Sequence, residues 1–334
     1  MRRFIWLAVL AAVGWSIWWA VATLGLVRGI DGWFAARQSE GWQAETSAIA
    51  FEGYPFDILL TLKDPALADP ETGVAFEASA LTLQAKLWAP GSMTLGLPDD
   101  PILLANPEDR YRLLTQKGQA RLSVKTNAAL ELEDMMAAAD AWLLSRDAGD
   151  LLSGGASEAA VQQDAEEPAT YQFDLNVDAL RPGEVMRDTL FIPEDWPVNF
   201  DRLTVQARVH FDRPWDVTAL EVSRPQPRRI VINEAEAIWG ELRLRFAAGL
   251  EVDEVGNASG TVNVQARNWR AMLTLAETGG VLPSALKPQI EQALSTFAGL
   301  SGNPEALDLT LTLREGFVSL GFLPLGQAPR LILR

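Results

Sequence analysis

The chain opens with a long apolar run. No side chain from Phe4 to Val27 carries a charge. A helix rises 1.5 Å per residue, and about 20 apolar residues cross the hydrocarbon core of a bilayer. We therefore expect residues 1–28 to form a transmembrane anchor. The large apolar side chains on which this expectation rests are Phe4, Trp6, Leu10, Trp15, Trp18, Trp19, Leu24 and Leu26.

The charges that flank the run predict its orientation. Arg2 and Arg3 precede it, whereas Arg28 follows it and is soon balanced by Asp31. Because cytoplasmic flanks are enriched in Lys and Arg, we expect a single-pass protein of the inner membrane with its N-terminus in the cytoplasm. The main domain is then periplasmic, and the tryptophans in the second half of the run suit the outer leaflet.

Two other interpretations of the run are possible. The small residues Ala20-Val21-Ala22 could be the cleavage site of a signal peptide. Against cleavage, the apolar residues continue through Leu24, Leu26 and Val27, which makes the run longer than the core of a typical signal peptide. The other alternative is a buried helix of a globular domain. The uncleaved anchor is the favoured interpretation.

After the anchor, the spacing of the apolar residues changes. Residues 29–41 predict a helical extension of the span that ends at Gly41. From there apolar and polar residues alternate, which predicts antiparallel strands with one buried and one wet face. The predicted strands are residues 56–63, 80–88, 93–95, 120–125, 171–177, 202–211, 230–232, 238–246, 261–266, 307–313 and 317–322.

Two adjoining segments depart from this alternation. In residues 131–146 the apolar side chains fall at helical spacing, which predicts a helix packed on the sheet; a membrane-surface or partner helix is the alternative. Residues 147–168 are rich in Gly, Ser, Ala, Gln and acids, which predicts a linker or mobile loop. Two more helices are expected, one capped by Asn268 and one over residues 288–297.

These elements define the expected architecture. The fold class is α+β and β-rich, with an N-terminal transmembrane helix followed by curved antiparallel meander sheets and a few packing helices. We expect an anchor over 1–28, a first β-rich unit with a closing helix over 29–146, the linker over 147–168, and a second β-rich unit with two helices over 169–334.

Composition narrows the possible functions. The formal net charge is −16 and the pI is about 4.6, so nucleic acid is not expected as a partner. The chain has no Cys, which excludes disulfides and thiolate chemistry, and one histidine, His210, which the alternation places on a wet strand face. No Gly-x-Ser-x-Gly, phosphate loop or dinucleotide fingerprint is present, and the acidic pairs lack calcium-loop spacing. We expect no enzyme activity, no metal and no cofactor.

Two tryptophans are the candidate ligand-binding residues. Trp88 and Trp239 fall on the otherwise polar side of their predicted strands. A large exposed ring of this kind is often covered by a ligand or a partner. The alternative is that helices or neighbouring loops bury both rings.

Three stretches carry a resemblance to a known family. They are Gly53-Tyr54-Pro55-Phe56, Ala237-Ile238-Trp239-Gly240-Glu241-Leu242 and Glu315-Gly316-Phe317-Val318-Ser319-Leu320-Gly321. On these residues the chain resembles, over nearly its whole length, the domain-of-unknown-function family 2125, uncharacterised N-terminally anchored envelope proteins of Gram-negative bacteria. That resemblance implies no activity.

The alternating strands and the closing hairpin are also similar, more distantly, to AsmA-like envelope proteins. This second resemblance implies lipid carried along a curved, apolar-lined sheet, although the chain is too short for a long lipid bridge. Neither resemblance supplies a catalytic or binding residue.

The sequence therefore favours a non-enzymatic, membrane-anchored periplasmic protein. Its expected partners are the inner membrane, through the N-terminal helix, and a phospholipid or acyl ligand held against the apolar side of the sheet. The alternative is a scaffold whose sheet is fully covered and whose partner is another envelope protein. A hydrolase is disfavoured because no nucleophile constellation is found.

Overall fold

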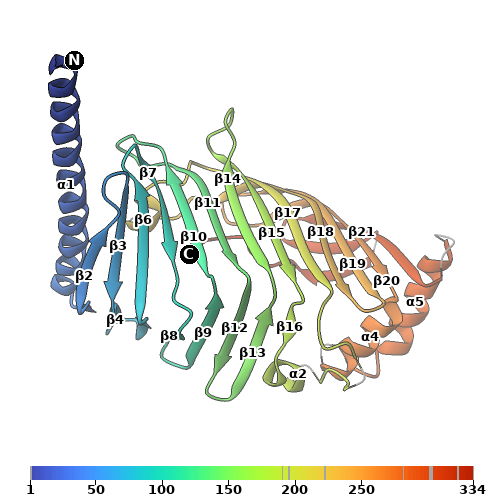
Figure 1. Ribbon diagram of the computed structural model, residues 1–334. Helices are drawn as coiled ribbons and strands as arrows, with labels where there is room; N and C mark the ends of the chain where they lie inside the picture. Colours follow the sequence, from blue (N-terminus) through green and yellow to red (C-terminus); the bar gives the residue numbers. More distant parts are fainter. Residues whose placement is uncertain are drawn as a thin grey trace.

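The computed structural model describes residues 2–189, 191–194, 196–221, 223–280, 282–300, 304–321 and 323–333. The chain begins with one long helix, α1 (Arg2–Ser39), and continues as antiparallel strands that form a curved sheet (Figure 1). Among the described residues, α1 is the one helix that is long and apolar enough to cross a membrane. The predicted N-terminal helix and its extension are confirmed.

Most of the strands build a 15-stranded sheet, which we call the main sheet. Every pairing described within it is antiparallel, and neighbours in the sheet follow one another along the chain as a meander. In spatial order its strands are β2 (Ala48–Glu52), β3 (Asp57–Lys63), β6 (Ala80–Lys86), β7 (Ala89–Gly96), β10 (Gln119–Val124), β11 (Leu132–Ala139), β14 (Ser157–Gln163), β15 (Thr170–Asp178), β17 (Arg202–Phe211), β18 (Pro227–Trp239), β19 (Leu242–Val252), β20 (Ala258–Arg267), β21 (Ala306–Arg314), β22 (Phe317–Leu320) and β23 (Leu323–Gln327).

A second sheet of eight strands, the side sheet, adjoins the first half of the main sheet. Each of its strands continues a main-sheet strand along the chain after a few residues, so that long strands pass from one sheet into the other. We call the line of these breaks the crease. The side-sheet strands are β1 (Gln43–Glu45), β4 (Ala66–Asp69), β5 (Val74–Glu77), β8 (Ile102–Ala105), β9 (Arg110–Gln116), β12 (Ala141–Arg146), β13 (Gly149–Gly154) and β16 (Arg181–Pro182).

At the crease the alternation of side chains slips by one residue. Leu62 in β3 and Leu67 in β4 belong to the same buried cluster although they are an odd number of positions apart, which an unbroken strand would not allow. The extra residue is the mark of a β-bulge. In β3–β4 the slip coincides with Asp64, whose φ of 48° is in the left-handed region.

Polar side chains stabilise the crease at another of these positions. Lys117 also has a positive φ, 50°, which costs roughly 1–2 kcal/mol for a residue with a Cβ. Its backbone N–H donates to Asp99 Oδ1 over 3.2 Å, and its ammonium donates to Asp140 Oδ2 over 2.7 Å. The hydrogen bond to Asp140 raises the pKa of Lys117. These contacts hold the bulge between β9 and β10 in place.

The structure contradicts two predicted segments. Residues 131–146 are the strands β11 and β12, not a helix, and residues 147–168 contain β13 and β14, not a linker. The slip at Asp140 explains the first error, because two phases of strand alternation joined by one extra residue give apolar residues at helix-like spacing. The second segment has small side chains, but its backbone is paired on both sides, to β11 and to β15.

The pairing also crosses the predicted domain boundaries, since β11, β14 and β15 are neighbours in the main sheet. The described ranges hold four shorter helices: α2 (Glu184–Thr189), α3 (Thr218–Glu221), α4 (Trp269–Thr278) and α5 (Lys287–Leu300). The last two match the predicted pair. Asn268 precedes α4 with a φ of 56°, but its side chain makes no capping hydrogen bond, so capping by that side chain is wrong.

A cross-linking experiment tests the strand register that sequence reasoning missed. Ala137 in β11 lies directly opposite Ala159 in β14, whereas Glu158 points to the other face. Directly opposed Cβ atoms are about 5 Å apart, within reach of a disulfide after small adjustments. Because the chain has no native Cys, the double variant Ala137→Cys/Ala159→Cys is expected to cross-link on mild oxidation, measured by gel mobility.

The matched control is Ala137→Cys/Glu158→Cys, which differs by one position. It is expected to cross-link at least about fivefold more slowly, because adjacent residues of a strand point to opposite faces. Equal rates for the two pairs would contradict the register.

Candidate functional site

One face of the main sheet is apolar from its first strand to its last. The register aligns Leu60 with Leu83 at the first strands, and Val264 with Leu309 at the last ones. Polar and charged residues occupy the opposite side of the same strands. We call these the apolar face and the polar face. What covers the apolar face decides what the molecule can bind.

Helix α1 covers the beginning of the apolar face. Ile58, Leu60 and Leu87 form a buried cluster on which Trp19, Ala22, Leu26, Val27 and Ile30 of the helix pack. Further along, Phe34 packs with Ala44 and Leu62. The second half of α1 is therefore docked on the domain, whereas residues 2–14 are exposed.

Helices α4 and α5 cover the other end. Trp269 and Ala298 are buried against Ala266 and Leu307, with Leu244 and Leu309 packed around them. The indole of Trp269 donates to the Pro304 carbonyl over 3.1 Å. The segment after β23 covers more of the same end, since Leu331 packs on a second cluster that contains Ala248, Leu250 and Ala258.

A connection between β17 and β18 covers part of the middle. Trp215 packs edge-on against Phe211, and its backbone N–H donates to the hydroxyl of Tyr171 over 3.0 Å. Burial raises the pKa of the Tyr171 phenol, so the group stays protonated and donates to the Leu132 carbonyl over 3.4 Å. The connection thereby bridges from β17 to β11 across the apolar face.

Five neighbouring strands between these covers leave their apolar side chains accessible. None of these side chains belongs to the buried clusters described above, and all are half-buried or exposed. Met135, the most exposed of the large ones, is 43% exposed. We call this set the open strip: Met93 and Leu95 of β7, Ala120 and Leu122 of β10, Met135 and Ala137 of β11, Ala159 and Val161 of β14, and Phe173 and Leu175 of β15.

The two predicted ligand-binding tryptophans have different surroundings. Trp239 lies on the apolar face beside Leu242 and is only 8% exposed. Phe200 stacks on its ring at 4.3 Å, Trp196 meets it edge-on, and its indole donates to the Pro197 carbonyl over 2.8 Å. Its placement on the polar side is therefore wrong, and a neighbouring loop buries it.

One edge of the Trp239 ring remains at the wall of a small pocket of about 270 Å³. Trp88, in contrast, is 59% exposed at the turn between β6 and β7. Its ring contacts Phe56, and the Lys86 ammonium lies 5.7 Å from its centroid. The two rings are on different parts of the sheet and do not form one site, so their role in ligand binding stays a prediction.

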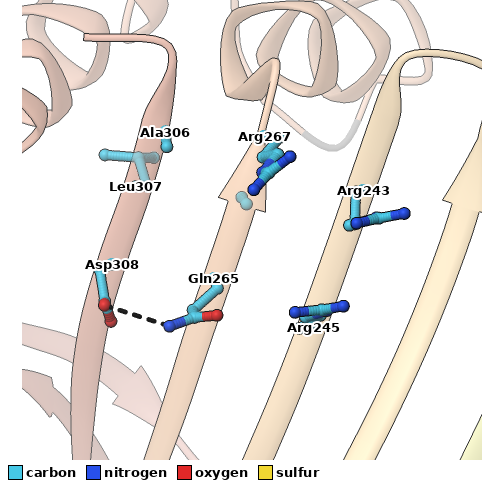
Figure 2. A pocket seen from close by; sticks show the side chains of 8 residues that line it. Arg243, Arg245, Gln265, Arg267, Ala306, Leu307 and Asp308 are labelled. Carbon is cyan, nitrogen blue, oxygen red and sulfur yellow. Dashed lines mark hydrogen bonds between the residues drawn. The ribbon is translucent and has the colours of Figure 1, made fainter. Parts of the chain in front are cut away.

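The polar face carries a cluster of arginines that sequence reasoning did not single out. Figure 2 shows Arg243, Arg245 and Arg267 projecting from β19 and β20 around a pocket of about 190 Å³. Glu236 accepts from Arg245 at 2.6 Å and lies 3.4 Å from Arg243. Glu236 offsets part of the charge of the cluster, and the pocket is smaller than typical ligand sites of 300–1,000 Å³.

Chemistry-bearing side chains are scattered. His210 is half-buried on β17, with Nδ1 2.9 Å from the Thr170 hydroxyl, so it is less exposed to water than its strand pattern predicts. Within the described ranges, no group of three or more His, Cys, Asp or Glu side chains is placed to hold a metal ion.

The fold and the open strip define a class: an open antiparallel β-sheet protein preceded by a helix that is able to span a membrane. The chain belongs to the family described as "Uncharacterized protein conserved in bacteria (DUF2125)", whose model matches residues 19–329. The match begins inside α1, so it includes the docked half of that helix. None of the curated proteins matches the chain.

Truncation of the two tryptophans tests their different burial. We expect Trp239→Ala to lower the free energy of unfolding by about 3–5 kcal/mol, as for other buried aromatic residues. Trp88→Ala is expected to cost less than about 1 kcal/mol because the ring is mostly exposed. Urea denaturation followed by circular dichroism measures both values. Similar losses for the two variants would contradict the different surroundings described here.

Proposed function

We propose that this protein is a non-enzymatic, membrane-anchored binder of an acyl-chain ligand, and that the open strip is where the ligand lies. The proposal rests on the open strip. It is a contiguous patch of ten apolar side chains, drawn from five paired strands and left uncovered between α1 and the C-terminal helices. Contiguous exposed apolar patches often mark a site that a ligand or partner covers.

The dimensions of the strip suit an acyl chain. Neighbouring strands are about 4.8 Å apart, so five strands extend over about 20 Å across the sheet. One leaflet contributes about half of the ~30 Å hydrocarbon core, so an extended acyl chain reaches about 15 Å. The strip is long enough to hold one chain. The absence of any charged residue among its ten members favours an apolar ligand over a polar one.

The membrane anchor supplies the source of such a ligand. Helix α1 would hold the domain beside the bilayer, and the positive charges of Arg2 and Arg3 favour a cytoplasmic N-terminus. The domain would then lie in the periplasm, at the outer leaflet of the inner membrane. A phospholipid is the natural ligand at this place, and envelope maintenance is the corresponding role.

One feature favours the alternative of a protein-interaction module. Strand β23 ends the order of the main sheet, and Leu323 and Leu325 on it are about half exposed. An edge strand with exposed apolar side chains can pair with a strand from another chain. A scaffold would use this edge and leave the open strip empty.

Two adjacent methionines test the proposal. Met135 is in the open strip, whereas Met136 points to the polar face opposite Arg121. A carboxylate in the strip would face the hydrocarbon of a bound ligand at a cost of several kcal/mol. We therefore expect Met135→Glu to reduce co-purifying phospholipid at least tenfold, measured by native mass spectrometry and lipid extraction, and Met136→Glu to leave it unchanged.

Equal lipid content in the two variants would contradict binding at the open strip. A lipid-free wild-type chain, together with a defined protein partner that is lost when β23 is deleted, would favour the scaffold. Circular dichroism of both variants checks that the sheet is intact.

A further inference from the structure

The first two hairpin turns of the main sheet carry a group of exposed aromatic side chains next to α1. Tyr54 and Phe56 are in the turn between β2 and β3 and are 58% and 56% exposed. Trp88, in the turn between β6 and β7, contacts Phe56. We call this set, together with its neighbours on β2 and α1, the aromatic collar: Trp15, Trp18, Phe51, Tyr54, Phe56 and Trp88.

Hydrogen bonds fix the β2–β3 turn to a definite level of the helix. The indole of Trp15 donates to the Pro55 carbonyl over 2.7 Å, and the indole of Trp19 donates to the Asp57 carbonyl over 2.8 Å. Between them, the hydroxyls of Ser16 and Tyr54 are 2.8 Å apart. The turn is therefore held beside residues 15–19 of α1.

This level lies inside the thickness of a bilayer. At 1.5 Å per residue, Trp15 is about 18 Å and Trp19 about 24 Å along the helix from Arg3. The hydrocarbon core is about 30 Å thick, and any tilt of the helix shortens these depths further. If Arg3 is at the cytoplasmic boundary, the β2–β3 turn cannot lie outside the membrane. It must reach the acyl region of the opposite leaflet.

The residues around the turn are suited to that position. Rings that are apolar over most of their surface and polar at one end are enriched at the boundary between lipid and water. The nearby charges are Glu52, Asp57 and Lys86. Asp57 and Lys86 are opposed across β3 and β6, and the Lys86 ammonium lies over the Trp88 ring. Lys side chains extend toward headgroups in this way while their stems stay in the apolar layer.

A charged turn on the same edge limits how much of the sheet is immersed. The β14–β15 turn contains Asp164, Glu166 and Glu167 and lies at the edge of the main sheet that also bears the β6–β7 turn (Figure 1). Three carboxylates would not enter a hydrocarbon layer. The sheet must therefore incline away from the membrane with distance from α1, so that only its first two hairpins reach the lipid.

We propose that the aromatic collar is a second membrane-contact surface, inserted into the outer leaflet of the bilayer that α1 crosses. The partner is the lipid bilayer itself. The proposal rests on the membrane-spanning role of α1 but not on ligand binding by the open strip. Insertion places the turns of the first two hairpins against acyl chains, so a lipid can reach this edge of the sheet, beside β7, without passing through water.

Site-specific fluorescence tests the insertion. Since the native chain has no Cys, single cysteines can be introduced by Tyr54→Cys and Trp88→Cys in the collar, and by Glu166→Cys and Glu108→Cys as controls at the β14–β15 and β8–β9 turns. Each full-length variant is labelled with the environment-sensitive dye NBD and reconstituted into phosphatidylcholine/phosphatidylglycerol vesicles. The measurement is quenching by lipids that carry a doxyl group on the acyl chain.

We expect quenching at positions 54 and 88 to be at least threefold stronger than at 166 and 108, with a blue-shifted emission. Equal quenching at all four positions in protein that sediments with the vesicles would overturn the collar while leaving the span intact. Failure of the wild-type chain to sediment with vesicles at all would overturn the span, and the collar with it. The lipid content of the Met135→Glu variant is independent of both outcomes.

Discussion

The whole molecule depends on the need to cover one apolar face of an antiparallel sheet. Burial of apolar surface contributes about 25 cal/mol per Å², and a sheet that is apolar on one side gains this only where something packs on it. The chain supplies covers from its two ends: α1 from the N-terminal side, and α4, α5 and Leu331 from the C-terminal side. The alternation within each strand produces the sheet, and the segments at the two ends of the chain determine which parts of its apolar face are covered.

The part that stays uncovered lies in the main sheet between the strands that α1 covers and those that the C-terminal segments cover. Strands β10, β11 and β14 have no helix of their own, and their connections are the loops 125–131 and 164–169 or residues of the crease. Their apolar side chains are smaller than those under the helices, with Ala120, Ala137 and Ala159 in one row. Small side chains lessen the cost of exposure and leave space above the sheet. Both properties make it less costly for this part of the face to stay uncovered.

Simple alternation predicted those strands that lie wholly on one side of the crease. Residues 202–211 alternate without interruption, and β17 has the same bounds. Alternation failed where a strand crosses the crease, because the extra residue at Asp140 converts a period of two into a pattern that resembles a helix. Low hydrophobicity similarly concealed β13 and β14, whose stability comes from backbone pairing with neighbours rather than from large side chains. Such pairing is not visible in a single local segment.

The sequence predicted the kind of site, an apolar face of the sheet, but not which strands would leave that face uncovered. One-sided strands indicated an apolar face, and the long run from Phe4 indicated the anchor. Trp239 is buried, as the alternative for both rings had it, because Trp196 and Phe200 cover its ring. Both are distant from it in sequence and reach it only in the folded chain. Trp88 stays exposed, with only Phe56 and the Lys86 ammonium described against its ring.

Helix α1 runs without a break from Arg2 to Ser39, and its second half is fixed to the domain through Phe34 and Trp19. No flexible tether therefore separates the exposed first turns of the helix from the sheet. The two cannot rotate independently, so whatever holds the first half of α1 also sets the orientation of the whole sheet.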